Sequence, residues 1–411
     1  MSNTNKLKIF NDPIYGFISI PSELIYDLIE HRYFQRLRRI SQLGLSYLVY
    51  PGATHTRFHH ALGCMYLMQK AVEVLRQKNV AISKDEEQAL YIAILLHDIG
   101  HGPFSHAMEH SIVNIHHEDI SLMFMEKLNT EFDGALSLAI DVFRGEYKRK
   151  FLLQLISGQF DMDRMDYLKR DSFYSGVAEG NINSERLIQM INVVDDELVI
   201  DEKGIYSVEK FLVSRRLMYW QAYLHKTSIV AEQILMNTLK RAKELTEKGQ
   251  DLHSGTGLSF FLENKIDAHN FDDAILEKFA LLDDVDILFA LKQWQKSNDY
   301  VLSSLSTMII NRDLLKIEIS PEKFTKERLN QLQKAYADLE NISIKESEFF
   351  VFKGKISNKA YDKSSEPILI LHKNGKVEDM ISATDKSYLK SLSEEVTKYF
   401  LCYPKVIRRK S

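Results

Sequence analysis

The segment that most constrains the fold is an apolar run, residues 89–96, which directly follows a helix-start signal. Ser83 and Glu86 have the spacing of a capping box, so a helix is predicted to begin there. A helix that is apolar nearly all round must be buried on every side. Glycines follow at positions 100 and 102 and end it. We therefore expect the chain to fold around this helix, with His97 and Asp98 at its buried end.

The rest of the chain is also predicted to be mainly α-helical. It contains only seven prolines, and apolar residues recur at spacings of three and four. The predicted helices are residues 21–40, 58–76, 104–112, 118–128, 151–156, 163–169, 184–191 and 208–246. A hairpin is predicted over residues 197–206. After about residue 300, alternating patterns predict strands at residues 315–319, 349–353 and 368–372. The predicted domains are a helical domain, 1–290, and a smaller C-terminal α+β region, 291–411.

Composition excludes several classes of protein. The formal net charge is −4, so whole-chain charge gives no nucleic-acid signature, and no nucleic-acid partner is expected. The two cysteines lie far apart in sequence, which excludes a disulfide framework and a zinc-cysteine site. The longest apolar run, residues 89–96, is far shorter than the ~20 residues that span a bilayer. The first ten residues lack a signal-peptide core. A cytoplasmic protein without membrane contact is expected.

Histidines cluster in one part of the chain. Nine of the 14 histidines lie between His55 and His117, interleaved with acidic residues. A single histidine is as readily explained by a structural role. Nine together favour a metal or phosphate site.

His97 and Asp98 close the apolar helix. Two polar side chains at a buried helix end need partners, because unpaired burial is costly. A metal ion would satisfy both; hydrogen bonds within a helix-end network are the alternative.

The loop after this helix supplies two more imidazoles, His101 and His106. His106 and Glu109 share a face at i, i+3, and a carboxylate beside an imidazole is the arrangement of a general acid. His117 is expected to face the same pocket.

Two later segments suggest a nucleotide. Asp163, Tyr167 and Asp171 fall on one helical face. Arg215 and Tyr223 fall on one face of another predicted helix, which suits phosphates and a flat base. An amphipathic core helix with snorkelling cations is the alternative for the second segment.

The order of motifs, His60, His97-Asp98 and Asp163, resembles the HD superfamily of metal-dependent phosphohydrolases. Several stretches are similar to its deoxynucleoside triphosphate triphosphohydrolase branch, which includes the mammalian SAM- and HD-domain enzyme; no SAM domain is expected here. The matching stretches are residues 10–14, 34–38, 42–44, 51–53, 57–60, 97–106, 163–171 and 222–226. The long run from His97 to His106 is the most specific of them.

The resemblance implies roles for individual residues. Four residues fall on metal-ligand positions: His60, His97, Asp98 and Asp163. Eight fall on positions that hold the sugar and phosphates: Gln42, Leu43, Arg57, Arg164, Tyr167, Asp171, Arg215 and Tyr223. Arg164 stands in place of a lysine, and Tyr219 in place of a histidine.

The resemblance also implies an allosteric nucleotide site and assembly into a dimer or tetramer. Five residues occupy the corresponding positions: Lys8, Ile9, Glu30, Gln35 and Arg38. Glu30 replaces an aspartate there.

The expected activity is hydrolysis of a deoxynucleoside triphosphate to deoxynucleoside and triphosphate, by water attack on the α-phosphorus. One divalent ion is expected, and the ligand set does not distinguish Mn, Fe, Mg, Zn or Ni. His106, oriented by Glu109, would protonate the leaving oxygen, while His101 and His117 stabilise charge on the phosphate. Two alternatives stay open. One is an HD phosphohydrolase acting on a monophosphate, a cyclic nucleotide or a guanosine polyphosphate. The other is a nucleotide sensor without catalysis.

Overall fold

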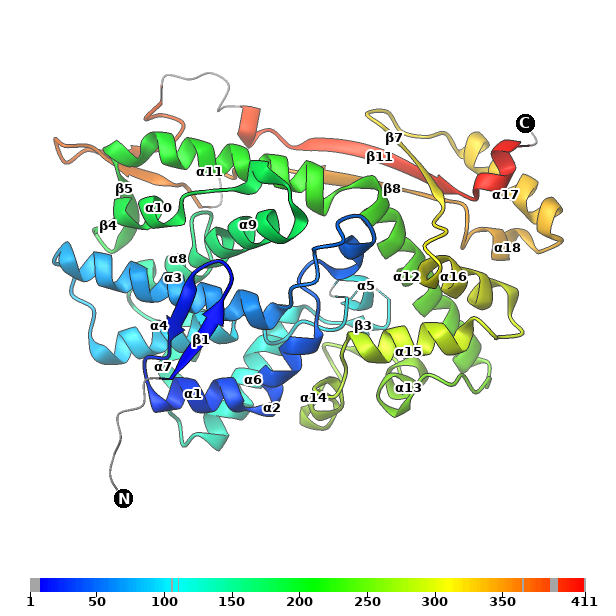
Figure 1. Ribbon diagram of the computed structural model, residues 1–411, viewed down its shortest axis with the longest axis horizontal. Helices are drawn as coiled ribbons and strands as arrows, with labels where there is room; N and C mark the ends of the chain where they lie inside the picture. The colour runs from blue at the N-terminus through cyan, green and yellow to red at the C-terminus, as the bar shows by residue number, and fades with distance from the viewer. Residues whose placement is uncertain (1–7, 105, 110, 364–365, 385–390, 410–411) are drawn as a thin grey trace.

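The computed structural model describes all residues except 1–7, 105, 110, 364–365, 385–390 and 410–411. Helices dominate the described chain, as predicted (Figure 1). The helices are α1 (Glu23–Glu30), α2 (Arg32–Gln35), α3 (Arg57–Gln77), α4 (Lys84–Leu96), α5 (His106–Glu109), α6 (His117–Glu131), α7 (Ser137–Phe143), α8 (Lys150–Ile156), α9 (Met162–Ser175), α10 (Ser184–Met190), α11 (Ile205–Met218), α12 (Lys226–Glu247), α13 (Thr256–Glu263), α14 (Asp273–Phe279), α15 (Asp284–Trp294), α16 (Tyr300–Ile310), α17 (Lys326–Glu340) and α18 (Ile344–Ser347).

Helix α4 lies in the core, as the apolar run predicts. Every residue from Ala89 to Leu96 is buried. The predicted capping box starts the helix: Glu86 N donates to Ser83 Oγ, and Ser83 N donates to the Glu86 carboxylate. Helices α3 and α7 pack against α4. His97 caps the C-terminus of α4, so His97 and Asp98 enter the site from its core.

Short sheets accompany the helices. The strands are β1 (Ile9–Asp12), β2 (Gly16–Ser19), β3 (Val113–Asn114), β4 (Ile191–Val194), β5 (Glu197–Asp201), β6 (Ile266–Asp267), β7 (Lys316–Ser320), β8 (Phe352–Asn358), β9 (Leu369–Leu371), β10 (Val377–Asp379) and β11 (Val396–Tyr403). They form the hairpin β1-β2, the parallel pair β3-β6, and two larger sheets with the orders β10-β9-β5-β4 and β7-β11-β8.

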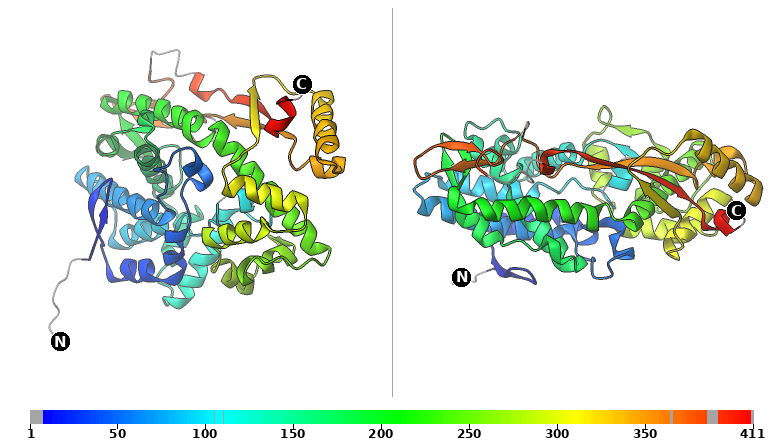
Figure 2. Two further views of the ribbon diagram at one scale, coloured as in Figure 1. Left: turned by 45° about the vertical axis from the view of Figure 1, so that its right-hand side comes forward. Right: turned by 90° about the horizontal axis from the view of Figure 1, so that it is seen from above.

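The C-terminal region contains both strands and helices, as predicted. β11 pairs antiparallel with β7 and β8, with Phe400 opposite Ile319 and Gly354. Figure 2 shows this long ribbon running lengthwise along the molecule toward α17. β9 pairs in parallel with β5, so this region also extends a sheet begun much earlier in the chain. α15 runs across the predicted boundary near residue 290, and the division into two domains stays a prediction.

Two predicted elements were wrong in their placement. The hairpin at 197–206 is instead β4-β5, and its turn is Asp195-Asp196, where both residues adopt positive φ. Asp tolerates the left-handed conformation because its short side chain bonds locally. The single helix at 208–246 is broken by a π-helical turn, Tyr219–Tyr223, and α12 begins afresh after His225.

Two other predicted helices are shorter than expected. The helix at 104–112 is reduced to α5. The helix at 21–40 is divided into α1, α2 and a 3-10 turn, because His31 is extended and accepts from the backbone of the next turn. None of the described helices combines the length and apolar character that crossing a bilayer requires.

Candidate active site

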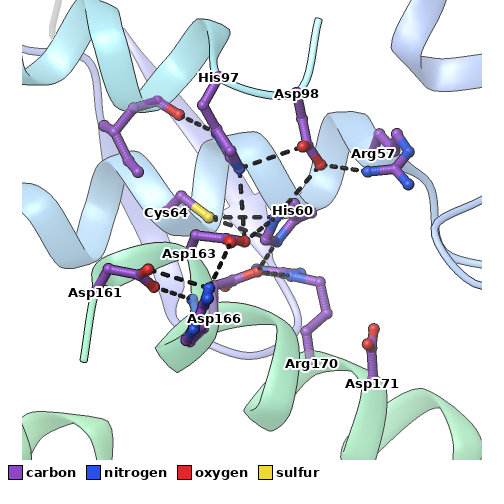
Figure 3. Close-up of polar contacts among 12 residues, drawn as sticks. Arg57, His60, Cys64, His97, Asp98, Asp161, Asp163, Asp166, Arg170 and Asp171 are labelled. Atoms are coloured by element: carbon purple, nitrogen blue, oxygen red, sulfur yellow. Dashed lines mark hydrogen bonds and ion pairs between the residues drawn. The ribbon is translucent and has the colours of Figure 1, made fainter. Parts of the chain in front are cut away.

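Three helices bring the four predicted metal ligands together (Figure 3). His60 lies on α3, His97 and Asp98 at the end of α4, and Asp163 in the first turn of α9. His60 Nε2 lies 3.0 Å from Asp163 Oδ1, and His97 Nε2 lies 3.5 Å from the same oxygen. Asp98 lies 3.7 Å from His60 Nε2 and 3.6 Å from His97 Nε2. Atoms each ~2.1 Å from one octahedral ion lie about 3 Å apart, so the cluster is only slightly wider than a metal requires.

Both imidazoles present Nε2 to the cluster. His97 Nδ1 lies 2.7 Å from the Ile94 carbonyl oxygen, which only accepts, so the proton is on Nδ1. His60 Nδ1 lies 2.8 Å from Asp166 Oδ2, which fixes the same tautomer. Nε2 of His97 is buried and has no hydrogen-bond partner among the described residues. Buried lone pairs aimed at two carboxylates fit a bound cation.

The two carboxylates are held ionised. Burial opposes the charge of Asp98, but the Arg57 guanidinium and nearby imidazoles outweigh it and hold the pKa of Asp98 well below its usual range. Burial likewise opposes the charge of Asp163, but the adjacent imidazoles of His60 and His97 outweigh it and lower its pKa. Anionic oxygens with imidazole nitrogens suit a first-row divalent ion.

Cys64 is the alternative fourth ligand in this cluster. Its Sγ lies 3.4 Å from His60 Nδ1, and it groups with His60, His97 and Asp163 by distance. Only a thiolate binds metal well, and burial raises the pKa of the Cys64 thiol well above its usual value. Asp98 is the better ligand because it is already an anion.

The loop that follows α4 is held from several sides. Gly100 is required there, because a Cβ would lie 2.2 Å from the His117 carbonyl oxygen. The fully buried Arg36 donates to the carbonyls of Ile99 and His101 at 2.8 and 2.9 Å. Asp284 accepts from Phe104 N at 2.9 Å. These contacts keep the His101 imidazole beside the cluster.

Comparison with known proteins agrees with this geometry. The HD domain model matches residues 57–171, and the model of the HD-associated region matches residues 182–254. The chain is 33% identical to the uncharacterized protein YwfO of Bacillus subtilis, covering 97% of this chain and 92% of that protein. The chain belongs to the HD-domain phosphohydrolase superfamily.

Two further HD relatives are informative. The crystal structure of a phosphohydrolase from Bacteroides thetaiotaomicron is 50% identical, with a TM-score of 0.94, over 97% of this chain and 100% of that one. A deoxynucleoside triphosphate triphosphohydrolase SAMHD1 homologue of Dictyostelium discoideum is 30% identical over 67% of this chain. This chain spans 55% of that protein's length.

A cavity of about 540 Å³ opens beside the HD cluster. It is large enough for a nucleotide-sized ligand. The predicted ligands Asp98 and Asp163 form one wall together with His101 and His117. Seven of the eight predicted substrate residues also line it: Gln42, Leu43, Arg57, Arg164, Tyr167, Asp171 and Tyr223.

Arg215 is the predicted substrate residue that does not line this cavity. It is buried on α11, near enough to Tyr167 to act on its phenol electrostatically. Its Nε and Nη1 have no hydrogen-bond partner among the described residues. Two buried guanidinium nitrogens without hydrogen-bond partners are costly, which fits a group that binds an anion.

Asp171 lines the cavity and is held by two neighbouring side chains. Tyr223 donates its hydroxyl to Asp171 Oδ2 at 2.8 Å, and His55 Nε2 lies 2.7 Å from Asp171 Oδ1. His55 is stacked on Tyr174. The π-helical turn places Tyr219 and Tyr223 on the same wall, with ring centroids 5.1 Å apart.

The predicted catalytic residues are only partly brought together. His101 and His117 stack with ring centroids 3.8 Å apart. Burial and the Arg57 charge lower the pKa of His101, so it is a neutral imidazole. Glu109 contacts His116 at 3.2 Å and His117 at 3.4 Å. The side chain of His106 lies outside the described residues, so its pairing with Glu109 stays a prediction.

The five predicted allosteric residues lie around β1, α1 and the turn after α2. Lys8 pairs with Glu23 and covers the Tyr26 ring, and Ile9 and Glu30 are exposed. Gln35 donates to the Ile29 carbonyl, and Arg38 donates to Gln35 and covers the Phe58 ring. Gln35 thus connects Arg38 to the C-terminal end of α1.

Several residues of the site were not among the predicted ones. Asp166 and Arg170 lie beneath His60, and His55 holds Asp171. The i, i+4 spacing of Asp166 and Arg170 was a usable signal, because such a pair stabilises a helix. Nothing local in the sequence marks His55 as the partner of Asp171.

Proposed function

We propose that this chain hydrolyses deoxynucleoside triphosphates to deoxynucleoside and inorganic triphosphate. The observation that supports it is one cavity that joins an HD cluster to an aromatic pocket ending in Asp171. In the proposal, the triphosphate lies at the HD cluster and the sugar lies in the aromatic pocket. The relationship to SAMHD1-type enzymes favours the same substrate class.

The proposed reaction is cleavage of the bond between the α-phosphorus and the 5′ oxygen. Water forms a new bond to the α-phosphorus, triphosphate is released, and the 5′ oxygen takes a proton. The cluster would be filled by one divalent ion, which supplies Lewis-acid polarisation of the α-phosphate. His60, His97, Asp98 and Asp163 hold that ion in the proposal.

The side chains around the cluster have separate proposed roles. Arg57, Arg164 and Arg215 bind the phosphates, and arginine suits them through its planar fork of donors. Neutral His101 donates a hydrogen bond, and His117 stabilises charge on the phosphate. His106 remains the proposed proton donor to the 5′ oxygen, oriented by Glu109.

The sugar pocket would select deoxyribose. Asp171 accepts from Tyr223, and its remaining lone pairs suit the 3′ hydroxyl. Tyr223 packs against the 2′ carbon in the proposal, which leaves a ribose hydroxyl without room. Gln42 and Leu43 on the facing wall would contact the nucleoside.

We further propose that the protein is an allosteric homo-oligomer, dimer or tetramer, with a nucleotide bound near Lys8, Ile9, Glu30, Gln35 and Arg38. Gel filtration with light scattering, with and without each deoxynucleotide, tests this. A nucleotide-dependent change in mass supports it, and a monomer under all conditions contradicts it.

The activity is tested by incubating the four deoxynucleoside triphosphates with Mn²⁺, Mg²⁺, Fe²⁺, Zn²⁺ or Ni²⁺ and separating the products. Deoxynucleoside with triphosphate supports the proposal. Orthophosphate or pyrophosphate, or turnover only of monophosphates, cyclic nucleotides or guanosine polyphosphates, places the chain elsewhere in the HD superfamily. Nucleotide binding without any turnover would make it a sensor.

A further inference from the structure

We infer that a buried chain of ion pairs, Asp12–Arg170–Asp166, positions the metal ligand His60 and couples its metal affinity to the N-terminal hairpin. The inference rests on the proposed metal site. It assigns positioning roles to three residues that do not line the cavity. This chain of ion pairs runs from Asp12 on β1, through Arg170 and Asp166 on α9, to His60 on α3. Figure 3 shows its members on α9 and α3.

Asp166 is the direct contact of His60. Its Oδ2 lies 2.8 Å from His60 Nδ1, on the side of the ring opposite the cluster. An imidazole that donates Nδ1–H to a carboxylate presents its Nε2 lone pair in a fixed direction. Asp166 is fully buried, and both of its carboxylate oxygens accept hydrogen bonds from Arg170.

Arg170 holds Asp166 with two parallel bonds. Its Nε donates to Oδ2 at 2.9 Å and its Nη2 donates to Oδ1 at 3.0 Å. Arg170 is also fully buried. Such a bidentate pair fixes the plane of the carboxylate, and so the direction in which it accepts from His60.

Asp12 joins this pair to the hairpin. Its Oδ2 accepts from Arg170 Nη1 at 2.7 Å. Its Oδ1 accepts from the backbone N–H groups of Ile14 and Tyr15, at 2.9 and 3.0 Å, in the turn between β1 and β2. One buried carboxylate thus connects the turn to Arg170, and displacement of the hairpin would move Arg170.

Gly63 shows how closely the pair is fitted beneath α3. A Cβ at this position would lie 2.0 Å from Asp166 Oδ1 and 2.3 Å from Arg170 Nη2. Gly63 follows His60 by less than one helical turn, so the ion pair occupies the space of its missing side chain.

The test is the affinity for Mn²⁺ alone, without nucleotide, measured by the electron paramagnetic resonance signal of the free ion. Asp166→Asn keeps the shape and loses the charge. It is expected to weaken Mn²⁺ binding by ~10- to 100-fold, the range for lost orienting partners of metal-bound histidine. Asp12→Asn changes a residue on β1 rather than α9, and it is expected to weaken Mn²⁺ binding by a smaller factor.

Asp299→Asn is the matched control. Asp299, the N-cap residue of α16, forms a similar two-bond pair with Arg241 of α12, at 2.6 and 3.1 Å. This variant should keep the wild-type affinity for Mn²⁺. Thermal unfolding of every variant gives the loss of stability to compare.

The outcomes separate this inference from the proposed function. If Asp166→Asn and Asp12→Asn bind Mn²⁺ like the wild type, the inference is overturned. If Asp166→Asn does not fold, Asp12→Asn is the deciding variant. Mn²⁺ binding by Asp12→Asn that is weaker than binding by Asp299→Asn supports the inference, and equal binding overturns it. A wild type that binds Mn²⁺ but releases no triphosphate overturns only the proposed reaction.

Discussion

His60 Nε2 lies 3.0 Å from Asp163 Oδ1, although the two residues belong to different helices, α3 and α9. The His60 imidazole offers a directed lone pair, and the Asp163 carboxylate offers an anionic oxygen. A third helix adds His97 and Asp98. A divalent ion requires nitrogen and oxygen ligands that converge on one point, and the three helices supply them. The following predictions depend on this arrangement.

Asp163→Ala is expected to remove bound metal while the protein stays folded. The variant takes away an oxygen close to both imidazoles, so the cluster loses its shared ligand. Elemental analysis after dialysis measures the metal. Asp171→Asn is the control, because Asp171 lines the same cavity without belonging to the cluster. Metal retained in Asp163→Ala would assign the fourth ligand elsewhere, with Cys64 the first candidate.

His106→Ala is expected to keep its metal and lose ~10²- to 10⁴-fold in kcat, the usual contribution of one general acid. Rates at saturating deoxynucleotide, with metal content measured on the same sample, check this. His117→Ala is the comparison, since Glu109 contacts His117 at 3.4 Å. If His106→Ala turns over normally and His117→Ala loses kcat, the acid is His117.

Arg215→Ala is expected to lower kcat/KM by about 10- to 100-fold, because a hydrogen bond to a charged group contributes ~1.5–3 kcal/mol. Two of its nitrogens have no hydrogen-bond partner among the described residues, so little else in the described protein depends on them. Arg216→Ala, one residue along α11, controls for helix stability. An unchanged kcat/KM would show that Arg215 does not reach the triphosphate.

Tyr223→Ala is expected to reduce the preference for deoxyribose over ribose by about 10-fold or more, since one rejected group in a pocket is worth ~1–3 kcal/mol. The ratio of kcat/KM for a deoxynucleotide and its ribonucleotide measures it. Tyr223→Phe keeps the ring and removes only the hydroxyl that Asp171 accepts. A preference lost equally in both variants would assign selection to the hydroxyl rather than to the ring.

The sequence predicted the parts of this structure that follow from local patterns. The capping box at Ser83 and the apolar run after it predict α4, and alternation predicts β7 and β9. The strand predicted at residues 349–353 was misplaced, because only its last two residues belong to β8. The break at Tyr219–Tyr223 could not be predicted, because no proline or glycine marks it and a π-turn depends on packing around the cavity. The pairs His55–Asp171 and His60–Asp166 join residues far apart in the chain, and their partners are set only when α3 meets α9.

The most direct test of the metal site is a crystal structure of the protein grown with Mn²⁺, measured at the manganese absorption edge. The account predicts one anomalous peak with His60 Nε2, His97 Nε2 and carboxylate oxygens of Asp98 and Asp163 each within ~2.0–2.3 Å. A peak between Glu109, His116 and His117, or no peak with His60 and Asp163 still 3.0 Å apart, would contradict it.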